Sequence, residues 1–157
     1  MSDLEEPDAI YLSGGSKNHT ITFAPDPGTS PTITFLEAEN TACIWMGNRG
    51  AVRTQNIVFD GSSTGDMPTK NMTIRSTETL RAQSTFRVIG NVRNVTLRNM
   101  TIECNSRKGD TYSRAGVLLQ NFYDPAEPKG QSFIHDFTVD NCTIIATNSE
   151  LSDGIIQ

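Results

Sequence analysis

The stretch Val95-Thr96-Leu97-Arg98-Asn99-Met100-Thr101-Ile102 aligns without a gap on Phe137-Thr138-Val139-Asp140-Asn141-Cys142-Thr143-Ile144. Each stretch holds two short segments in which apolar and polar residues alternate, with an asparagine between them. A period of two residues is typical of a β-strand that buries one face. The match therefore indicates an internal repeat of strand, corner and strand.

Three phrases recur along the chain in a fixed order. An apolar run comes first, the Asn phrase begins with Asn or Asp and alternates in polarity, and the Thr-Ile phrase follows. The apolar runs are Ile10–Leu12, Cys43–Met46, Phe86–Ile89 and Val117–Leu119, with Gly154–Gln157 as the start of a fifth; the Asn phrases are Asn18–Ile21, Asn56–Phe59, Asn94–Leu97 and Asp136–Val139; the Thr-Ile phrases are Thr32-Ile33, Thr73-Ile74, Thr101-Ile102 and Thr143-Ile144.

This order predicts an all-β fold, a right-handed parallel β-helix of about four and a half turns with three short strands in each. We expect residues 9–157 to form the β-helix domain and residues 1–8 to form an N-terminal tail or cap. The unfinished last turn suggests part of a longer solenoid. The alternative fold is a β-sandwich, whose strands would be antiparallel.

Alternation also predicts which side chains point inward. The expected core columns are Ile21, Phe59, Leu97 and Val139; His19, Ile57, Val95 and Phe137; and Ile33, Ile74, Ile102 and Ile144. Asn99 and Asn141 fall at the corner between two strands, where stacked amides can form a hydrogen-bonded ladder.

Composition excludes several classes of function. The chain has a net charge of -5, and its basic residues are not clustered in sequence. We therefore expect no nucleic-acid partner and disfavour acidic partners in general. No window reaches the roughly 18 consecutive apolar residues of a membrane span, so no membrane insertion is expected. The three cysteines lack the spacing of a zinc site, and we expect buried free thiols and no bound cofactor.

One outward row could carry chemistry. The repeat places Thr22, Asp60, Arg98 and Asp140 on successive turns, so that an arginine lies between two carboxylates. Asp60, Arg98 and Asp140 are therefore the candidate catalytic residues: carboxylates can bind calcium or act as acid and base, while an arginine can engage a uronate. The competing interpretation is a stabilising ladder of opposite charges, which the similar pair Arg75 and Glu103 favours.

The apolar runs look apolar on both faces, whereas a strand with one exposed face should alternate. Either a loop such as Phe122–Pro125 covers the outer face, or another chain docks there. The candidate interaction face consists of Ile44, Trp45, Met46, Val117, Leu118 and Leu119.

Several phrases resemble those of a known group of proteins. The segments Asn18–Pro25, Asn56–Ser62 and Lys70–Ile74 are similar to the right-handed β-helix repeats of large secreted or cell-surface proteins from Bacteroidetes-type bacteria, within the pectate-lyase-like superfold. The resemblance covers residues 9–157. It implies a secreted or cell-surface location, and its motifs encode turns and ladders more than chemistry.

The resemblance leads to the expectation of a non-catalytic structural or adhesive β-helix segment that binds glycans or protein partners. The alternative is a carbohydrate-active enzyme, a polysaccharide lyase or a glycoside hydrolase, that uses Asp60, Arg98 and Asp140. A third hypothesis is self-association, either end to end through the open coil or side by side.

Overall fold

The computed structural model describes residues 3–36, 42–47, 53–64, 69–77, 84–105, 114–120, 133–146 and 152–156. These residues form fourteen strands and no helix, so none of them lies in a helix long and apolar enough to cross a membrane. The strands are β1 (Leu4–Glu6), β2 (Ile10–Leu12), β3 (Ile21–Phe23), β4 (Thr32–Phe35), β5 (Ala42–Met46), β6 (Thr54–Asp60), β7 (Met72–Ser76), β8 (Ser84–Ile89), β9 (Val92–Arg98), β10 (Met100–Cys104), β11 (Arg114–Gln120), β12 (Ile134–Asp140), β13 (Thr143–Ala146) and β14 (Ser152–Ile156).

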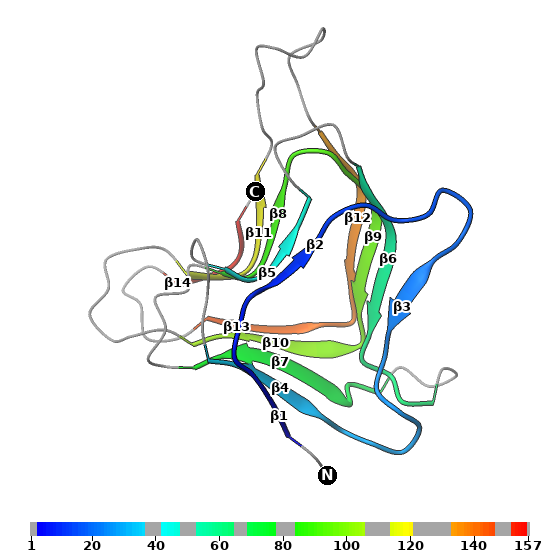
Figure 1. Cartoon of the computed structure of the whole chain (residues 1–157). Coiled ribbons are helices and arrows are strands. Elements are labelled where there is room, and N and C mark those ends of the chain that lie inside the picture. Colours follow the sequence, from blue (N-terminus) through cyan, green and yellow to red (C-terminus); the bar gives the residue numbers. More distant parts are fainter. Residues whose placement is uncertain are drawn as a thin grey trace, which may run out of the picture.

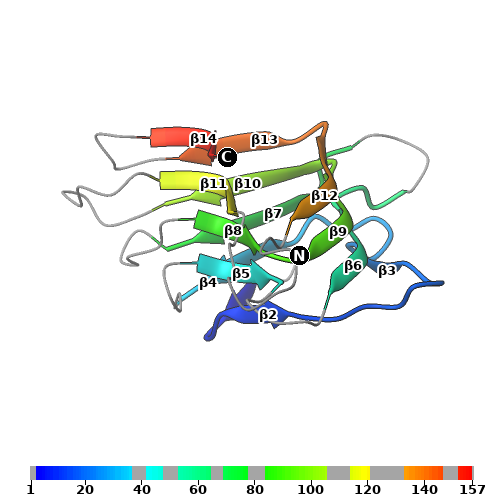
Figure 2. The same cartoon turned by 90° about the horizontal axis from the view of Figure 1, so that it is seen from above.

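The strands belong to three sheets, and the chain visits these sheets in the same cyclic order throughout (Figure 1). The Thr-Ile sheet has the order β1-β4-β7-β10-β13, the apolar-run sheet β14-β11-β8-β5-β2, and the Asn-phrase sheet β12-β9-β6-β3. We call one pass through the three sheets a rung. Figure 2 shows the rungs stacked from β2 at one end to β14 at the other.

Every strand pairs in parallel with its counterpart in the next rung. Parallel pairing requires a crossover between neighbouring strands, and here the other two sheets supply it. The all-β prediction is confirmed, and the architecture is consistent with a parallel β-helix. The alternative of an antiparallel β-sandwich is wrong.

The register confirms the predicted column of the Thr-Ile sheet. Ile33 lies beside Ile74, Ile74 beside Ile102, and Ile102 beside Ile144. The threonines before them pair in the same way, so that an outward threonine row follows the buried isoleucine column. Identical β-branched side chains in adjacent strands pack well on a pleated surface, which explains why the Thr-Ile phrase recurs.

The core lies between the three sheets. Val95, Leu97 and Ile102 in the middle of the stack are fully buried. Aromatic rings connect neighbouring rungs and two of the sheets. Phe59 stacks on Phe23 of the same sheet at 4.6 Å between ring centroids, and it meets Phe86 of the apolar-run sheet edge-on at 5.3 Å. Such ring pairs add specific contacts to the area that they bury.

The register of the first rung differs from the predicted one. Ile21 pairs with Ile57, and Phe23 with Phe59, so the Asn18 phrase lies two residues away from the expected alignment. A slip of two residues keeps every side chain on its face, and the apolar pattern alone could therefore not detect it. As a result His19 is exposed and precedes β3, which corrects its prediction as a core residue.

The two ends of the chain also join the stack. Leu4–Glu6, which we expected within a tail or cap, forms β1 and pairs with β4 as the edge strand of the Thr-Ile sheet. At the other end, β14 pairs with β11, placing Ile155 beside Val117 and Ile156 beside Leu118. The prediction of Gly154–Gln157 as a fifth apolar run is confirmed for Gly154 to Ile156.

Candidate functional site

A ladder of side-chain amides follows the corner between the Asn-phrase sheet and the Thr-Ile sheet. The Asn141 Nδ2 donates to Asn99 Oδ1 at 2.9 Å, and the Asn99 Nδ2 donates to Asp60 Oδ1 at 3.0 Å. Both asparagines have positive φ, 55° at Asn99 and 46° at Asn141. Asparagine tolerates this left-handed conformation better than most residues, which explains its place at a tight corner. The predicted ladder is confirmed.

In the rung below Asn99 the same corner position holds Gly61. A Cβ on Gly61 would lie 2.0 Å from the carbonyl oxygen of Asn99, so no asparagine fits there. The preceding residue, Asp60, supplies the acceptor that the ladder needs. The aspartate therefore ends the ladder at a place where the backbones approach closely.

The carboxylate of Asp60 is surrounded by donors. Its Oδ1 also accepts from the Ser62 backbone N–H at 3.0 Å, and its Oδ2 accepts from Arg98 Nε at 2.8 Å and Arg98 Nη2 at 2.7 Å. Asp60 is only 6% exposed. Burial alone would raise the pKa of Asp60, but the hydrogen bonds from Asn99, Ser62 and Arg98 and the charge of Arg98 outweigh it and lower this pKa.

These contacts bear on the two interpretations of the candidate catalytic row. The structure places Asp60, Arg98 and Asp140 side by side in three successive rungs, as predicted, with Arg98 bound to Asp60. Thr22 pairs with Val58 and so does not belong to this row. A buried carboxylate that is held ionised by four hydrogen bonds is a poor proton donor, and the contacts in this row are those of a charge pair between Asp60 and Arg98.

The described residues show no site for calcium, whereas the second expected charge pair is aligned across neighbouring strands. Among them, no group of three His, Cys, Asp or Glu side chains is placed to hold a metal ion. Arg75 and Glu103 do stand opposite each other on the Thr-Ile sheet, and the Arg75 Nε donates to Thr34 Oγ1 at 3.0 Å.

A second left-handed ladder was not predicted as such. Asn56, Asn94 and Asp136 have φ values of 56°, 51° and 53°, and each produces a bend within its strand. The Asn94 Nδ2 donates to Asn56 Oδ1 at 2.6 Å, and the Asn56 Nδ2 donates to the Ser16 carbonyl at 2.7 Å. The sequence signal for this ladder was the Asn or Asp that opens each Asn phrase after the first. Both residue types tolerate the left-handed conformation.

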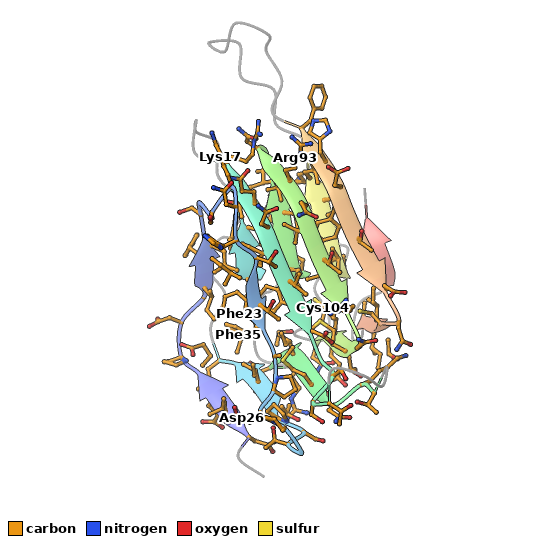
Figure 3. All side chains as sticks on the ribbon, turned by 90° about the vertical axis from the view of Figure 1, so that its right-hand side faces the viewer. Lys17, Phe23, Asp26, Phe35, Arg93 and Cys104 are labelled. Carbon is orange, nitrogen blue, oxygen red and sulfur yellow. The ribbon has the colours of Figure 1, made fainter. Side chains whose placement is uncertain are left out.

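The residues of this second ladder line part of a polar hollow of about 410 Å³. We call it the corner hollow, and its lining residues are Lys17, Arg53, Gln55, Asn56, Arg93, Asn94 and Asp136. Figure 3 places Lys17 and Arg93 at the same end of the Asn-phrase sheet. The sequence could not reveal this site, because its cations come from a loop, from the residue before β6, and from β9.

The electrostatics of the corner hollow differ from those of the whole chain. Three cations and one carboxylate line it, although the chain carries a net charge of -5. The Arg93 Nε lies 3.4 Å from Asp136 Oδ2, and both side chains are more than half exposed, at 56% and 65%. The Arg53 Nε donates to Asn91 Oδ1 at 2.9 Å. The amides of Gln55, Asn56 and Asn94 add hydrogen-bonding groups beside these cations.

Four of the six residues of the predicted apolar interaction face point inward and not outward. Ile44, Met46 and Val117 are buried at 2%, 0% and 0% exposure, and Leu119 packs partly buried against the core. Only Trp45 and Leu118 lie in the outward row. The runs do alternate, but large apolar residues occupy outward positions too. The loop proposed as a cover, Phe122–Pro125, lies outside the described residues.

Neighbouring rungs cover much of Trp45. Tyr11, from the rung below, stacks on it at 6.0 Å between ring centroids, and Arg87, from the rung above, places its Cζ 4.7 Å from the Trp45 ring centre. The Arg87 Nε and Nη2 also donate to Gln120 Oε1 at 2.8 and 2.5 Å. The outward side chains of this row therefore contact one another through ring stacking and a cation–π interaction.

The three cysteines are free, as predicted. Cys43 and Cys104 are buried, and Cys142 is half-buried. Burial raises the pKa of the Cys43 thiol, with a further contribution from nearby Cys104, and burial also raises the pKa of Cys142. A thiol of raised pKa is a weak nucleophile at neutral pH, so these residues pack like small apolar side chains.

Comparisons with protein-family models, with curated proteins and with solved structures found no match to this chain.

Proposed function

We propose that the chain is a non-catalytic structural and adhesive segment of a right-handed parallel β-helix, and that it binds acidic glycans in the corner hollow. Handedness follows from the general rule for crossovers between parallel strands, and the repeated passage through three sheets supports a solenoid. The resemblance of its repeats to those of secreted and cell-surface bacterial proteins supports an extracellular location.

The observation that carries the proposal is the gathering of Lys17, Arg53 and Arg93 around one hollow of an acidic chain. An arginine guanidinium presents a planar set of donors that matches a carboxylate or a sulfate. The neighbouring amides can bond sugar hydroxyls. An acidic polysaccharide, which carries uronate or sulfate groups along an extended chain, combines these features. Local charge thus overrides the expectation from net charge that acidic partners are disfavoured.

The absence of catalysis is part of the proposal. Asp60 is the most buried acid of the candidate row, and its carboxylate is engaged by Asn99, Ser62 and Arg98. A general acid or base needs access to the substrate and a free lone pair or proton. The alternative, a lyase or hydrolase that uses Asp60, Arg98 and Asp140, would require this set of bonds to open.

Binding to polygalacturonate oligosaccharides, measured by isothermal titration calorimetry at low salt, tests the proposal. The variant Arg53→Gln/Arg93→Gln should bind at least about tenfold more weakly, because each lost charge-assisted contact is worth on the order of 1 kcal/mol or more. Binding by the unaltered chain should also weaken as salt increases. Arg75→Gln is the matched control, since Arg75 is an exposed arginine on another sheet.

Two results would contradict the binding site: no affinity for any acidic glycan, or an equal loss in the Arg75→Gln control. The enzyme alternative has its own readout in the same samples. Release of unsaturated or reducing ends from acidic or neutral polysaccharides, with or without calcium, would replace the non-catalytic proposal.

A further inference from the structure

Two outward columns of side chains run past the corner hollow, at the end of the Asn-phrase sheet where Arg93 lies (Figure 3). Each column takes one residue from each of three successive rungs. The first column consists of Gln55, Arg93 and His135, and the second of Arg53, Asn91 and Phe133, the residues just before β6, β9 and β12. The bond from Arg53 Nε to Asn91 Oδ1 at 2.9 Å joins two members of the second column. We call these six residues the outer strip.

The outer strip lies on the solvent side of the sheet. Val92, between Asn91 and Arg93, points into the core and is 0% exposed, so its two neighbours point outward. None of the six residues of the strip is buried. Access to these side chains therefore does not depend on what lies beyond either end of the stack.

The character of the outer strip changes from one rung to the next. Arg53 and Arg93 supply the cations of the corner hollow in the first two rungs. The third rung instead presents Phe133, whose side chain is 43% exposed. Its ring meets the His135 ring at 5.9 Å between centroids with an interplanar angle of 64°. A large exposed aromatic ring thus follows directly after a pair of arginines.

We propose that the acidic glycan lies along the axis of the stack, across the strands, with its charged groups at Arg53 and Arg93 and a sugar ring stacked on Phe133. This inference rests on the proposed function and adds to it a direction of the chain and an aromatic subsite. Neighbouring strands are about 4.8 Å apart, which is close to the length of one sugar residue in an extended polysaccharide. One sugar for each rung therefore leads from the arginines to Phe133.

The chemistry of an acidic sugar matches both parts of the outer strip. Its carboxylate or sulfate pairs with a guanidinium, and its hydroxyl groups can bond the side chains of Gln55, Asn91 and His135. The C–H face of a pyranose ring is apolar and can stack on an aromatic ring, which buries area on both partners. A small inorganic anion would use the arginines alone and leave Phe133 without a role.

NMR titration of the isotope-labelled chain with digalacturonate and with hexagalacturonate tests the direction. The disaccharide is long enough for the arginines only, so it should shift the backbone amides around Arg53 and Arg93. The hexasaccharide should also shift those of residues 133–135, because it continues along the strip to the third rung.

Phe133→Ala tests the aromatic subsite. It should weaken the binding of hexagalacturonate about fivefold to tenfold and leave the affinity for digalacturonate within about twofold of that of the unaltered chain. Phe133→Leu keeps an apolar side chain without a ring and should behave like Phe133→Ala, whereas Phe133→Trp should retain the affinity of the unaltered chain.

Tyr11→Ala is the matched control, because Tyr11 is an exposed aromatic residue on the apolar-run sheet. It should leave both affinities unchanged. Circular dichroism confirms that each variant stays folded.

The outcomes separate this inference from the proposed function. If Phe133→Ala binds hexagalacturonate as the unaltered chain does, while Arg53→Gln/Arg93→Gln still weakens binding, the glycan site stands and the axial direction with its aromatic subsite is wrong. An equal loss for both ligands in Phe133→Ala, or the same loss in Tyr11→Ala, would also overturn the subsite. If the unaltered chain binds neither oligosaccharide, both proposals fail.

Discussion

At the scale of single residues, the same side-chain types could serve chemistry or architecture, and their partners decide between the two. Asp60 is buried and accepts hydrogen bonds from three residues, Ser62, Arg98 and Asn99. Asp140 occupies the equivalent place two rungs further on, yet it is exposed. Two aspartates in one column thus have different energetic roles.

Asp60→Asn should lower the free energy of unfolding by about 1–2 kcal/mol at pH 7, because charge-assisted bonds are lost while Arg98 stays half exposed. Since folding lowers the pKa of Asp60, its contribution is complete above the unfolded value of about 3.9 and disappears as the pH falls through the folded value. Urea denaturation from pH 7 to pH 2 should therefore show the two proteins converging in acid.

The matched control is Asp140→Asn, which should change the free energy of unfolding by less than about 0.5 kcal/mol because the side chain is exposed. A loss equal to that of Asp60→Asn would show that the whole charge row acts as a unit. A constant difference between Asp60→Asn and the unaltered chain down to pH 2 would contradict the assignment of a lowered pKa.

At the scale of elements, strands were easier to predict from sequence than corners and register. The Thr-Ile phrase identified its strands because an inward isoleucine recurs in every copy. The alignment of the Asn18 phrase was mispredicted, because a shift of two residues preserves the alternation, and contacts between rungs, such as the bond from Asn56 to Ser16, reveal the true register. β1 was not predicted because Leu4–Glu6 contains one apolar residue and none of the three recurring phrases.

The candidate site was less predictable than the fold. The row of Asp60, Arg98 and Asp140 could be predicted because these residues occupy the same position in successive repeats. Aligning the repeats therefore shows which of them lie side by side. The corner hollow depends on how a loop residue, Lys17, approaches arginines of two later rungs. The repeat pattern of the sequence does not predict that these three side chains lie close together.

The corner ladder can be dissected by two substitutions at one position. Asn99→Gly keeps access to positive φ but removes the bonds to Asp60 and from Asn141, and it should cost about 1–2 kcal/mol of stability. Asn99→Ala removes the same bonds and also forces alanine into the left-handed region, which adds about 1 kcal/mol or more. Thermal and urea denaturation of both variants measure this difference.

Asn94 provides the comparison in the second ladder, since it too has positive φ and donates to an asparagine below it. Asn94→Gly and Asn94→Ala should follow the same order. If glycine and alanine were equally destabilising at Asn99, the left-handed corner would make no contribution of its own, and the hydrogen bonds would explain the whole effect.

At the scale of the whole molecule, each rung is held mainly by the rungs beside it. Inner strands such as β6 and β9 have a pairing strand on both sides, whereas β1, β2 and β3 have one on a single side. In such a stack the free energy that stabilises a rung is close to the sum of its intrinsic stability and the interaction energies of its two interfaces with neighbouring rungs. The end rungs should therefore open most easily.

Hydrogen exchange measured by mass spectrometry should resolve this gradient. In dilute solution, amides of β6 to β10 should exchange at least about tenfold more slowly than those of β1 to β3, because local opening of an end rung breaks one interface instead of two. Uniform protection along the chain at low concentration would contradict this account, because it would mean that all rungs open together.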